Sequence, residues 1–300
     1  MYKISVLVLV YNQENYILEN LSSIDKQVID EKVEVVICND CSTDNTRKVI
    51  EGFLMNRQNT NIDFKLFNHS INKGMQQNFF WGFNECQGEF IAICDGDDFW
   101  LNDNKLNEQL QILLGNNDIG LVFSAAYWFD ELSKEYIKLP EINRLSLKSW
   151  SSLEGYVEQG SNFLNSPTFM FRKCLVDVIN NVSVIENTLW DLYIVLSIFR
   201  NNATLYYIDY RTAVYRILPN SISHSDKRIK QFAFFKKKLN TELLFLKNKK
   251  LIKTIKTKFY MSYFDCLSNC NFKERCMIFY LFFNKKSKLR LLSMLFKLKL

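Results

Sequence analysis

The chain has 300 residues, 48% of them hydrophobic, which is enough for one large core or for one core with an appendage. Its net charge of +6 hides an asymmetry: residues 1–226 hold 18 Lys and Arg against 29 Asp and Glu, and residues 227–300 hold 20 against 3. The longest uncharged apolar run near the C-terminus, residues 276–283, is far shorter than the roughly 18 residues that span a bilayer, which argues against a transmembrane segment.

The eight cysteines do not have the spacing of a disulfide framework, and the start MYKISVLVLVYNQ lacks the basic and apolar regions of a secretory signal. Cys38 and Cys41 form a single C-x-x-C, whereas a structural zinc site needs further ligands. We therefore expect reduced thiols, no zinc site, and a cytoplasmic location.

The first 94 residues alternate short β-branched segments with amphipathic segments. Strands are expected at residues 4–10, 33–38, 64–67 and 90–94, and helices at residues 14–24, 45–55 and 75–85. Near-continuous apolar strands separated by helices indicate an α/β fold, with a mostly parallel, Rossmann-like central sheet flanked by helices. Such sheets bind ligands at the carboxyl ends of their strands.

The remainder of the chain adds fewer regular elements. A strand is expected at residues 121–129, a long polar connection at 138–160, a helix at 189–200 and two short strands at 204–208 and 212–215. Long connections in compact enzymes often form substrate loops. From residue 225 onward the pattern is helical and basic, so we expect a catalytic domain over residues 1–225 and a basic helical extension over residues 226–300.

Polar residues gather at the predicted strand ends, and the acidic run Asp95-Gly96-Asp97-Asp98 is the strongest of them. A strand leading into it would point the side chains of Asp95 and Asp97 the same way, and Gly96 would let a ligand approach the backbone. A divalent cation relieves the repulsion between two such carboxylates, and oxygen ligands favour Mg²⁺ or Mn²⁺. The alternative is a turn that caps a helix beginning near Asp103.

Six segments, taken in order, resemble the inverting glycosyltransferases of family 2, which have the GT-A fold. They are VLVLVYNQENYI, EVVICNDCSTDNT, NKGMQQNFFWGFNECQGEFIAICDGDDFW, SPTFMFRK, LWDLYIVLSIF and AVYRILPNSIS. Each is a weak signal alone, but their common order is specific. The resemblance covers roughly residues 3–216, and it implies transfer of a sugar from a nucleotide-sugar donor with a divalent metal as cofactor.

The resemblance also implies which residues bind the donor. The nucleobase pocket would be lined by Val10 and Tyr11, with Asn12 beside them, and Asp40 would accept the N3 proton of a uracil-like ring. That contact favours a UDP- or dTDP-linked donor, because cytosine presents an acceptor at the same place. The alternative for the segment at Asp40 is a strand-to-helix turn capped by Ser42, Thr43 or Asp44.

The donor's phosphates would lie near Asn72, Lys73 and Gly74, although a solvated loop charge explains Lys73 equally well. In the acidic run, the resemblance implies that Asp97 is the direct metal ligand. The other members, Asp95, Gly96 and Asp98, would make ribose, phosphate or supporting contacts.

On the acceptor side, Asp191 is the candidate general base, since an alcohol is a poor nucleophile until its proton is removed. The alternative is a capping box formed with Thr188. Trp190 and Thr168 are candidate acceptor contacts. Because the chain has Leu218 where relatives often have histidine, no catalytic histidine is assigned, and the reaction is expected to be a single inverting displacement.

The basic C-terminal part interleaves cations with apolar residues and ends in KKSKLRLLSMLFKLKL. That composition suits an interfacial helix on an anionic membrane and a lipid-linked glycan acceptor in surface-polysaccharide synthesis, on the inner face of the cell membrane. The alternative is a helical subdomain with solvated lysines. Nucleic acid is not an expected partner, and the sequence does not indicate an oligomeric state. The competing functions are an inactive nucleotide-binding protein of the same fold and a sugar-nucleotide nucleotidyltransferase.

Overall fold

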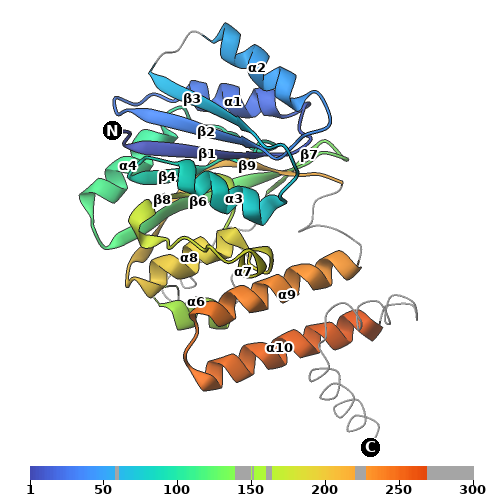
Figure 1. Ribbon diagram of the computed structural model, residues 1–300. Helices are drawn as coiled ribbons and strands as arrows, with labels where there is room; N and C mark the ends of the chain where they lie inside the picture. Colours follow the sequence, from blue (N-terminus) through green and yellow to red (C-terminus); the bar gives the residue numbers. More distant parts are fainter. Residues whose placement is uncertain (58–60, 139–149, 151, 160–163, 220–227, 269–300) are drawn as a thin grey trace, which may run out of the picture. The chain divides into compact units, whose positions relative to one another are not determined.

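The chain forms two compact units, Met1–Leu218 and Pro219–Leu300, each described here by itself. The computed structural model describes residues 1–57, 61–138, 150, 152–159, 164–219 and 228–268. The first unit contains one mixed sheet with helices on both faces (Figure 1). Its strands are β1 (Ile4–Val10), β2 (Val33–Asn39), β3 (Ile62–Asn68), β4 (Phe90–Ile93), β5 (Phe99–Trp100), β6 (Ile119–Asp130), β7 (Glu135–Lys138), β8 (Met170–Arg172) and β9 (Thr204–Ile217).

Its helices are α1 (Ile17–Asp25), α2 (Thr46–Asn56), α3 (Met75–Glu85), α4 (Lys105–Gly115), α6 (Leu153–Gln159), α7 (Val182–Glu186) and α8 (Trp190–Arg200), with 3-10 turns η1 (Ser166–Thr168) and η2 (Lys173–Leu175). The strand order is β3-β2-β1-β4-β8-β6-β9-β5, and β7 pairs with β6. Every strand and helix expected before residue 94 is present, with ends shifted by at most three residues.

The first four strands in this order are parallel, and β1, β2 and β4 are buried on two faces, whereas the edge strand β3 is only partly buried. Residues Val6 and Val8 of β1 pack into a core that also contains residues of α1, because alternate side chains of a strand point to the same face. The opposite face lies under α3, where a Cβ atom on Gly82 would come 2.7 Å from Leu7 Cδ1. Glycine at this position lets α3 approach the sheet closely. Because these four strands are parallel, their carboxyl ends all lie at one edge of the sheet.

The other half of the sheet is mixed. Strand β8 pairs antiparallel with both β4 and β6, whereas β6 and β9 run parallel to each other. The edge strands β5 and β7 are antiparallel to their partners. The expected fold class, an α/β sheet flanked by helices, is therefore confirmed; β3, β2, β1 and β4 form its continuous parallel part, and β6 with β9 adds one further parallel pair.

Three expectations for the later segments need correction. The two short strands predicted after residue 203 form one continuous strand, β9, which bulges against β6 near Ser124 and Ala125. The long connection begins with β7 and includes α6, while residues 139–149, 151 and 160–163 lie outside the described part. The short β5 and β8 were not predicted, because they have too few residues for a periodic pattern.

The described residues of the second unit form two helices, α9 (Arg228–Phe245) and α10 (Lys249–Ser268). Phe232 and Phe259 pack with ring centroids 5.4 Å apart. On α10, the buried Leu251 and Ile255 lie on one face. The terminal segment KKSKLRLLSMLFKLKL and His224 lie outside the described residues. Among the residues described, no helix is both long and apolar enough to span a bilayer.

Candidate functional site

The acidic turn, residues Asp95–Asp98, directly follows β4 at the carboxyl edge of the parallel strands. Two backbone hydrogen bonds shape it: Gly96 N donates to Leu9 O over 2.9 Å, and Asp98 N donates to Asp95 O over 2.8 Å. A Cβ atom on Gly96 would come 2.3 Å from Gln13 Oε1. A residue with a side chain would therefore have to push the Gln13 side chain aside and would press on Val10 and Ile17, so glycine here allows close packing.

The side chain of Val10 packs against the acidic turn. It is 2% exposed and belongs to the core, and its Cγ2 atom would lie 3.1 Å from a Cβ on Gly96. The role of Val10 in lining a nucleobase pocket stays a prediction. The neighbouring Tyr11 is 47% exposed and is the part of this strand end that a ligand can reach.

Burial raises the pKa of Asp95 to about 8, and the negative charges of Asp97 and Asp191 act in the same direction. Burial also raises the pKa of Asp97 to about 6, although hydrogen bonds and the positive charge of Arg216 oppose the shift. Low dielectric and like charge both disfavour the ionised form of a carboxyl group. The turn thus holds carboxylates that a cation would stabilise.

A divalent metal fits these two side chains. Asp95 Oδ1 is buried and has no hydrogen-bond partner in the described structure, so this oxygen has a free coordination position. The part of the chain that the structure describes brings no three His, Cys, Asp or Glu side chains together as a metal site. Mg²⁺ sites commonly use only one or two carboxylates and complete their coordination with substrate phosphates and water. Asp95 and Asp97 match that chemistry.

Asp98 has a different role from its two neighbours. It is 2% exposed, and its Oδ1 atom accepts a hydrogen bond of 2.8 Å from the backbone of Arg216 in β9. Burial and the charges of Asp97 and Asp95 raise its pKa well above the usual range. Of the expected ribose, phosphate or supporting contacts, the structure places Asp98 in a supporting one.

Asp40, at the end of β2, binds the segment that was expected to lie near the donor phosphates. Its Oδ1 atom accepts from Lys73 N over 2.7 Å, and its Oδ2 atom accepts from Gly74 N over 2.8 Å. Asn72 Oδ1 also accepts from Gly74 N, over 3.0 Å. These four residues therefore lie together. Asp40 is 2% exposed, and its hydrogen bonds in the structure hold this loop at the start of α3.

Asn12 joins the ends of β1 and β2. Its backbone is left-handed, with φ of 53°, a conformation that asparagine tolerates. Its Oδ1 atom accepts from Thr43 N over 2.8 Å, while its own N–H donates to Ser42 Oγ over 3.0 Å. Asp44 Oδ1 accepts from Thr46 N at the start of α2. Of the three residues in the turn alternative, only Asp44 therefore binds the first turn of α2, whose N-cap is Asn45, while Ser42 and Thr43 bind Asn12.

Asp191 lies in the first turn of α8, and its charge acts on Asp95 of the acidic turn. The predicted base and the predicted metal-binding turn therefore share one electrostatic environment. The capping-box alternative does not describe this helix, because its N-cap is Leu189 and the hydroxyl of Thr188 donates to Val184 O over 2.7 Å.

Neither predicted acceptor contact is exposed. Trp190 is 5% exposed and stacks on Phe79 with ring centroids 4.6 Å apart. Thr168 is 0% exposed, and its hydroxyl donates to Asn165 O over 2.7 Å. Both side chains are packed among buried residues, which does not favour a direct contact with an acceptor, and their assignment as acceptor contacts stays a prediction.

Several residues around the turn were not singled out from the sequence. Ser166 Oγ donates to Asp95 Oδ2 over 3.3 Å, and Trp100 Nε1 donates to Pro167 O over 2.8 Å, which ties η1 to the turn. Asn20 and Arg216 also bind the turn. Two sequence signals pointed to the last two of these residues: Asn20 is a polar residue on the apolar face of α1, and Arg216 closely follows the buried residues 212–214 of β9.

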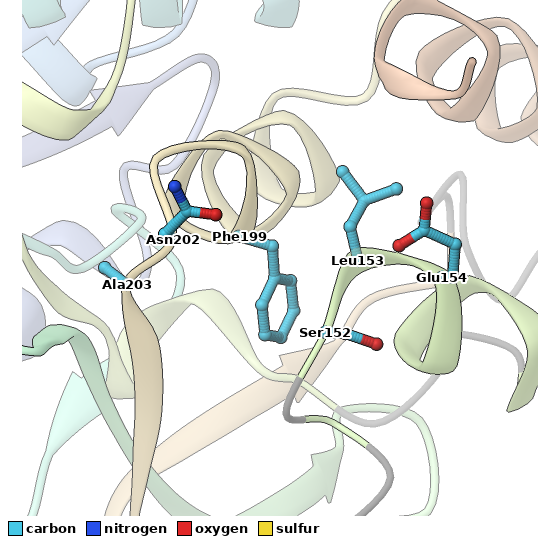
Figure 2. Close-up of a pocket in the computed structure, with 6 residues that line it drawn as sticks. All are labelled: Ser152, Leu153, Glu154, Phe199, Asn202 and Ala203. Atoms are coloured by element: carbon cyan, nitrogen blue, oxygen red, sulfur yellow. The ribbon is translucent and has the colours of Figure 1, made fainter. Parts of the chain in front are cut away.

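A separate hollow lies at the other end of α8 (Figure 2). It is lined by residues at the start of α6 and the end of α8, namely Ser152, Leu153, Glu154, Phe199, Asn202 and Ala203. It contains none of the predicted site residues. Because Asp191 begins α8 and Phe199 lies near its end, this hollow is distinct from the acidic turn.

The profile of glycosyl transferase family 2 matches residues 5–177, more than half of the chain. The chain belongs to glycosyl transferase family 2. The matched region contains the acidic turn and the strand ends around Tyr11 and Asp40. It ends before α8 and β9, which supply Asp191 and Arg216 to the same region of the structure.

Relatives in the family include transferases with stated substrates. Over 109 residues the chain is 37% identical to poly(ribitol-phosphate) beta-N-acetylglucosaminyltransferase TarS of Staphylococcus aureus, a match covering 36% of this chain and 18% of TarS. Over 116 residues it is 34% identical to UDP-Glc:alpha-D-GlcNAc-diphosphoundecaprenol beta-1,3-glucosyltransferase WfgD of Escherichia coli, covering 39% of this chain and 43% of WfgD. Each match spans less than half of the relative.

Solved structures resemble the chain over most of its length. TarS residues 1–349 in complex with UDP-GlcNAc superimpose with a TM-score of 0.64 at 18% identity, covering 93% of this chain and 79% of that one. Mannosyltransferase PcManGT from Pyrobaculum calidifontis, in complex with GDP-Man and Mn²⁺, gives a TM-score of 0.57 at 16% identity, covering 86% and 70%. These likenesses confirm the GT-A fold of this family 2 member.

Proposed function

We propose that this glycosyltransferase catalyses inverting, metal-dependent transfer of a sugar from a UDP- or dTDP-linked donor to a hydroxyl group of a glycan or lipid-linked glycan. The observation that carries the proposal is the buried Asp95 Oδ1 atom, which has no hydrogen-bond partner among the described residues and lies in an acidic turn that the charge of Asp191 also reaches. An inactive nucleotide-binding protein would need neither feature.

In the proposed mechanism, Asp95 and Asp97 hold Mg²⁺ or Mn²⁺, which when bound would neutralise the charge of the departing nucleoside diphosphate. Asp191 accepts the proton of the acceptor hydroxyl as that oxygen attacks the anomeric carbon. The bond from the anomeric carbon to the diphosphate oxygen breaks on the opposite face, so one displacement inverts the configuration. The fixed acidic turn and η1 keep the donor oriented during this step.

The donor proposal combines Asp40 with the exposed Tyr11. Each Asp40 oxygen accepts one backbone N–H, and a carboxylate has about four lone-pair sites, so an imide N–H can still be accepted. The structure of TarS in complex with UDP-GlcNAc supports a uridine donor, while that of PcManGT is a complex with GDP-Man. The fold is thus compatible with a uracil or a guanine base in the donor, and the proposed preference for a pyrimidine rests on Asp40.

We expect UDP and dTDP, in the presence of Mn²⁺, to raise the melting temperature of the protein, and CDP and GDP to raise it less at equal concentration. A ligand that binds only the folded state stabilises it by mass action, about 2.7 kcal/mol at 100 times its dissociation constant. A thermal-shift panel of nucleotides and nucleotide sugars measures this, with EDTA as the metal-free control. A response to GDP alone would contradict the pyrimidine assignment, and any positive donor is then tested for diphosphate release.

We also propose that the second unit binds an anionic membrane surface from the cytoplasmic side, which would suit a lipid-linked acceptor. Lys249, Lys253 and Lys256 are exposed and follow one another at helical spacing on α10. The buried Leu251 and Ile255 lie away from them on the helix. Their charge is therefore available to a polyanionic surface.

We expect the triple variant with Lys249, Lys253 and Lys256 changed to glutamate to bind phosphatidylglycerol vesicles about 100-fold more weakly than the wild type, because each lysine near such a surface contributes about 1 kcal/mol. Vesicle flotation of the full chain measures this. The matched control changes the exposed Lys26, Lys32 and Lys48 of the first unit to glutamate, which gives the same net charge. Equal loss in both triple variants, or no loss in either, would contradict a specific role for α10.

A further inference from the structure

The backbone of the acidic turn is held by side chains on both of its sides. The turn itself supplies only the bond from Asp98 N to Asp95 O, and Gly96 N is bound to β1. The buried carbonyl oxygens in and beside the turn also need hydrogen-bond donors. Two side chains that lie far apart in the sequence, Asn20 and Arg216, supply those donors.

The side-chain amide of Asn20 in α1 lies within hydrogen-bonding distance of three backbone carbonyl oxygens in and just before the turn. Its Nδ2 atom lies 3.3 Å from Cys94 O, 2.9 Å from Asp95 O and 2.8 Å from Asp98 O, and the residue is 0% exposed. One amide group therefore contacts the backbone just before the turn, at its first residue and at its last. The amide has two N–H donors, so its two shortest contacts, to Asp95 O and Asp98 O, are the buried hydrogen bonds that a movement of the turn would break, each at a cost of about 1–3 kcal/mol.

Arg216 of β9 binds Asp97 and Asp98 in the second half of the turn. Its Nε atom donates to Asp97 O over 2.7 Å, and its backbone N–H donates to Asp98 Oδ1 over 2.8 Å. Its Nη1 atom donates to Glu131 over 2.9 Å and its Nη2 atom to Glu19 over 2.6 Å. The two glutamates fix the plane of the guanidinium group, so its Nε–H is aimed at the turn.

The two halves of this arrangement are connected through α1. Glu19, which binds Arg216, and Asn20, which binds the turn, are consecutive residues of this helix. Arg216 also lies over the rings of Tyr16 and Phe99, at 4.9 Å and 5.4 Å from the ring centroids. The guanidinium group is thus held from several directions and has little freedom to turn away.

We infer that Asn20 and Arg216 are positioning residues that set the separation of the Asp95 and Asp97 carboxylates, and through it the affinity of the turn for a divalent cation. The inference rests on the proposed function, since it assumes that the turn binds a metal. Neither side chain is proposed to touch the cation. Residues that orient metal ligands in this way typically affect metal affinity 10–100-fold.

The test uses the full chain and the loss of the free Mn²⁺ electron-paramagnetic-resonance signal on binding, measured in the presence of UDP and without turnover. We expect Asn20→Leu and Arg216→Lys each to weaken Mn²⁺ binding about 10–100-fold. Leucine has the same branching and the same number of heavy atoms as asparagine but has no donors. Lysine keeps the positive charge of Arg216 but loses the fork that reaches Asp97 and both glutamates.

Matched controls remove similar buried groups elsewhere. Gln27→Met removes a buried amide that donates to Asn102 O over 2.8 Å, and Arg57→Lys disturbs an arginine that donates to Asp25 and to Ile62 O. We expect both controls to lower the metal-free melting temperature and to leave Mn²⁺ affinity within twofold of the wild type.

The outcomes separate the inference from the proposed function. If the wild type binds Mn²⁺ and UDP but the two variants bind equally well, the inference is wrong and the function stands. If the wild type does not bind Mn²⁺ with UDP, the metal-dependent function is wrong. Should both variants fail to fold, Glu19→Ala decides: this side chain is 55% exposed, so folding should persist, its acceptor for Arg216 Nη2 is lost, and unchanged Mn²⁺ affinity would overturn the inference.

Discussion

Replacing Asp191 with asparagine is expected to lower kcat by a factor of about 10²–10⁴, the usual contribution of a positioned general base. Asparagine keeps the shape of the side chain and its hydrogen bond to Leu192 N, which is 2.7 Å long, but it cannot take the acceptor's proton. Binding of the donor and of Mn²⁺ should be unchanged, because Asp191 is not proposed to ligate the metal. Steady-state kinetics with a donor identified by thermal shift would measure the loss.

The control for this variant is Glu154→Gln, which removes a negative charge from the first turn of α6, in the hollow at the far end of α8. It tests whether losing an acidic residue near a helix N-terminus affects turnover by itself, since such charges stabilise helices modestly. Near-normal turnover by Asp191→Asn would remove the base assignment. A parallel fall in both variants would indicate a structural effect.

Replacing Asp97 with asparagine is expected to abolish the stabilisation of the protein by Mn²⁺ and UDP while leaving the metal-free protein folded. The pKa of Asp97 is raised to about 6 by burial, and its charge raises the pKa of Asp95. Removing that charge should therefore relieve repulsion in the metal-free turn. Melting temperatures with and without Mn²⁺ measure both effects, and Asp63→Asn on the exposed part of β3 is the matched control.

The same carboxyl groups predict how metal binding depends on pH. Because the pKa of Asp95 is raised from 3.8 to about 8 in the folded state, the folded protein binds more protons than the unfolded chain between these values. The stability of the metal-free protein should therefore fall as the pH rises from about 4 to 8. A metal competes with those protons, so Mn²⁺ should raise the melting temperature more at pH 8 than at pH 6. An equal rise at both values would contradict metal binding by this pair.

Strand and helix periodicity was sufficient to predict the parallel half of the sheet. The apolar runs at Ile4–Val10 and Val33–Asn39 are buried on two faces, and this type of strand has a clear signature in sequence. The position of the acidic turn followed directly, because it comes after a strand of this kind. The expected place of Lys73 and Gly74 near the donor came instead from the family resemblance, and their contact with Asp40 was not predicted.

Side-chain direction could not be predicted in the same way. Val10, Trp190 and Thr168 lie at the expected places along the chain, but each side chain turns into the core. A sequence pattern locates a residue on a strand end or helix start within a residue or two, and the choice between core and pocket depends on packing across the sheet. That packing involves Phe79 and Asn165, which no local pattern connects to those positions.

Asn20 shows a signal that could have been used. It shares helical spacing with Ile17, Leu21 and Ile24, all of them fully buried, so it is a polar side chain on an apolar face. A buried amide needs partners, and backbone carbonyls of a nearby irregular turn are the natural ones. Arg216, in contrast, reaches the turn through a pairing of β9 with β6 that sequence periodicity does not specify.

The bond between Arg216 and Asp97 joins residues 119 positions apart. During synthesis, the acidic turn leaves the ribosome long before the strand that completes it, and closing so long a segment has an entropic cost. We therefore expect the parallel half of the sheet to form early and the donor site to mature last in folding. A chain ending at residue 177, where the family profile stops, would contain every acidic residue of the turn and still lack the arginine that fixes its shape.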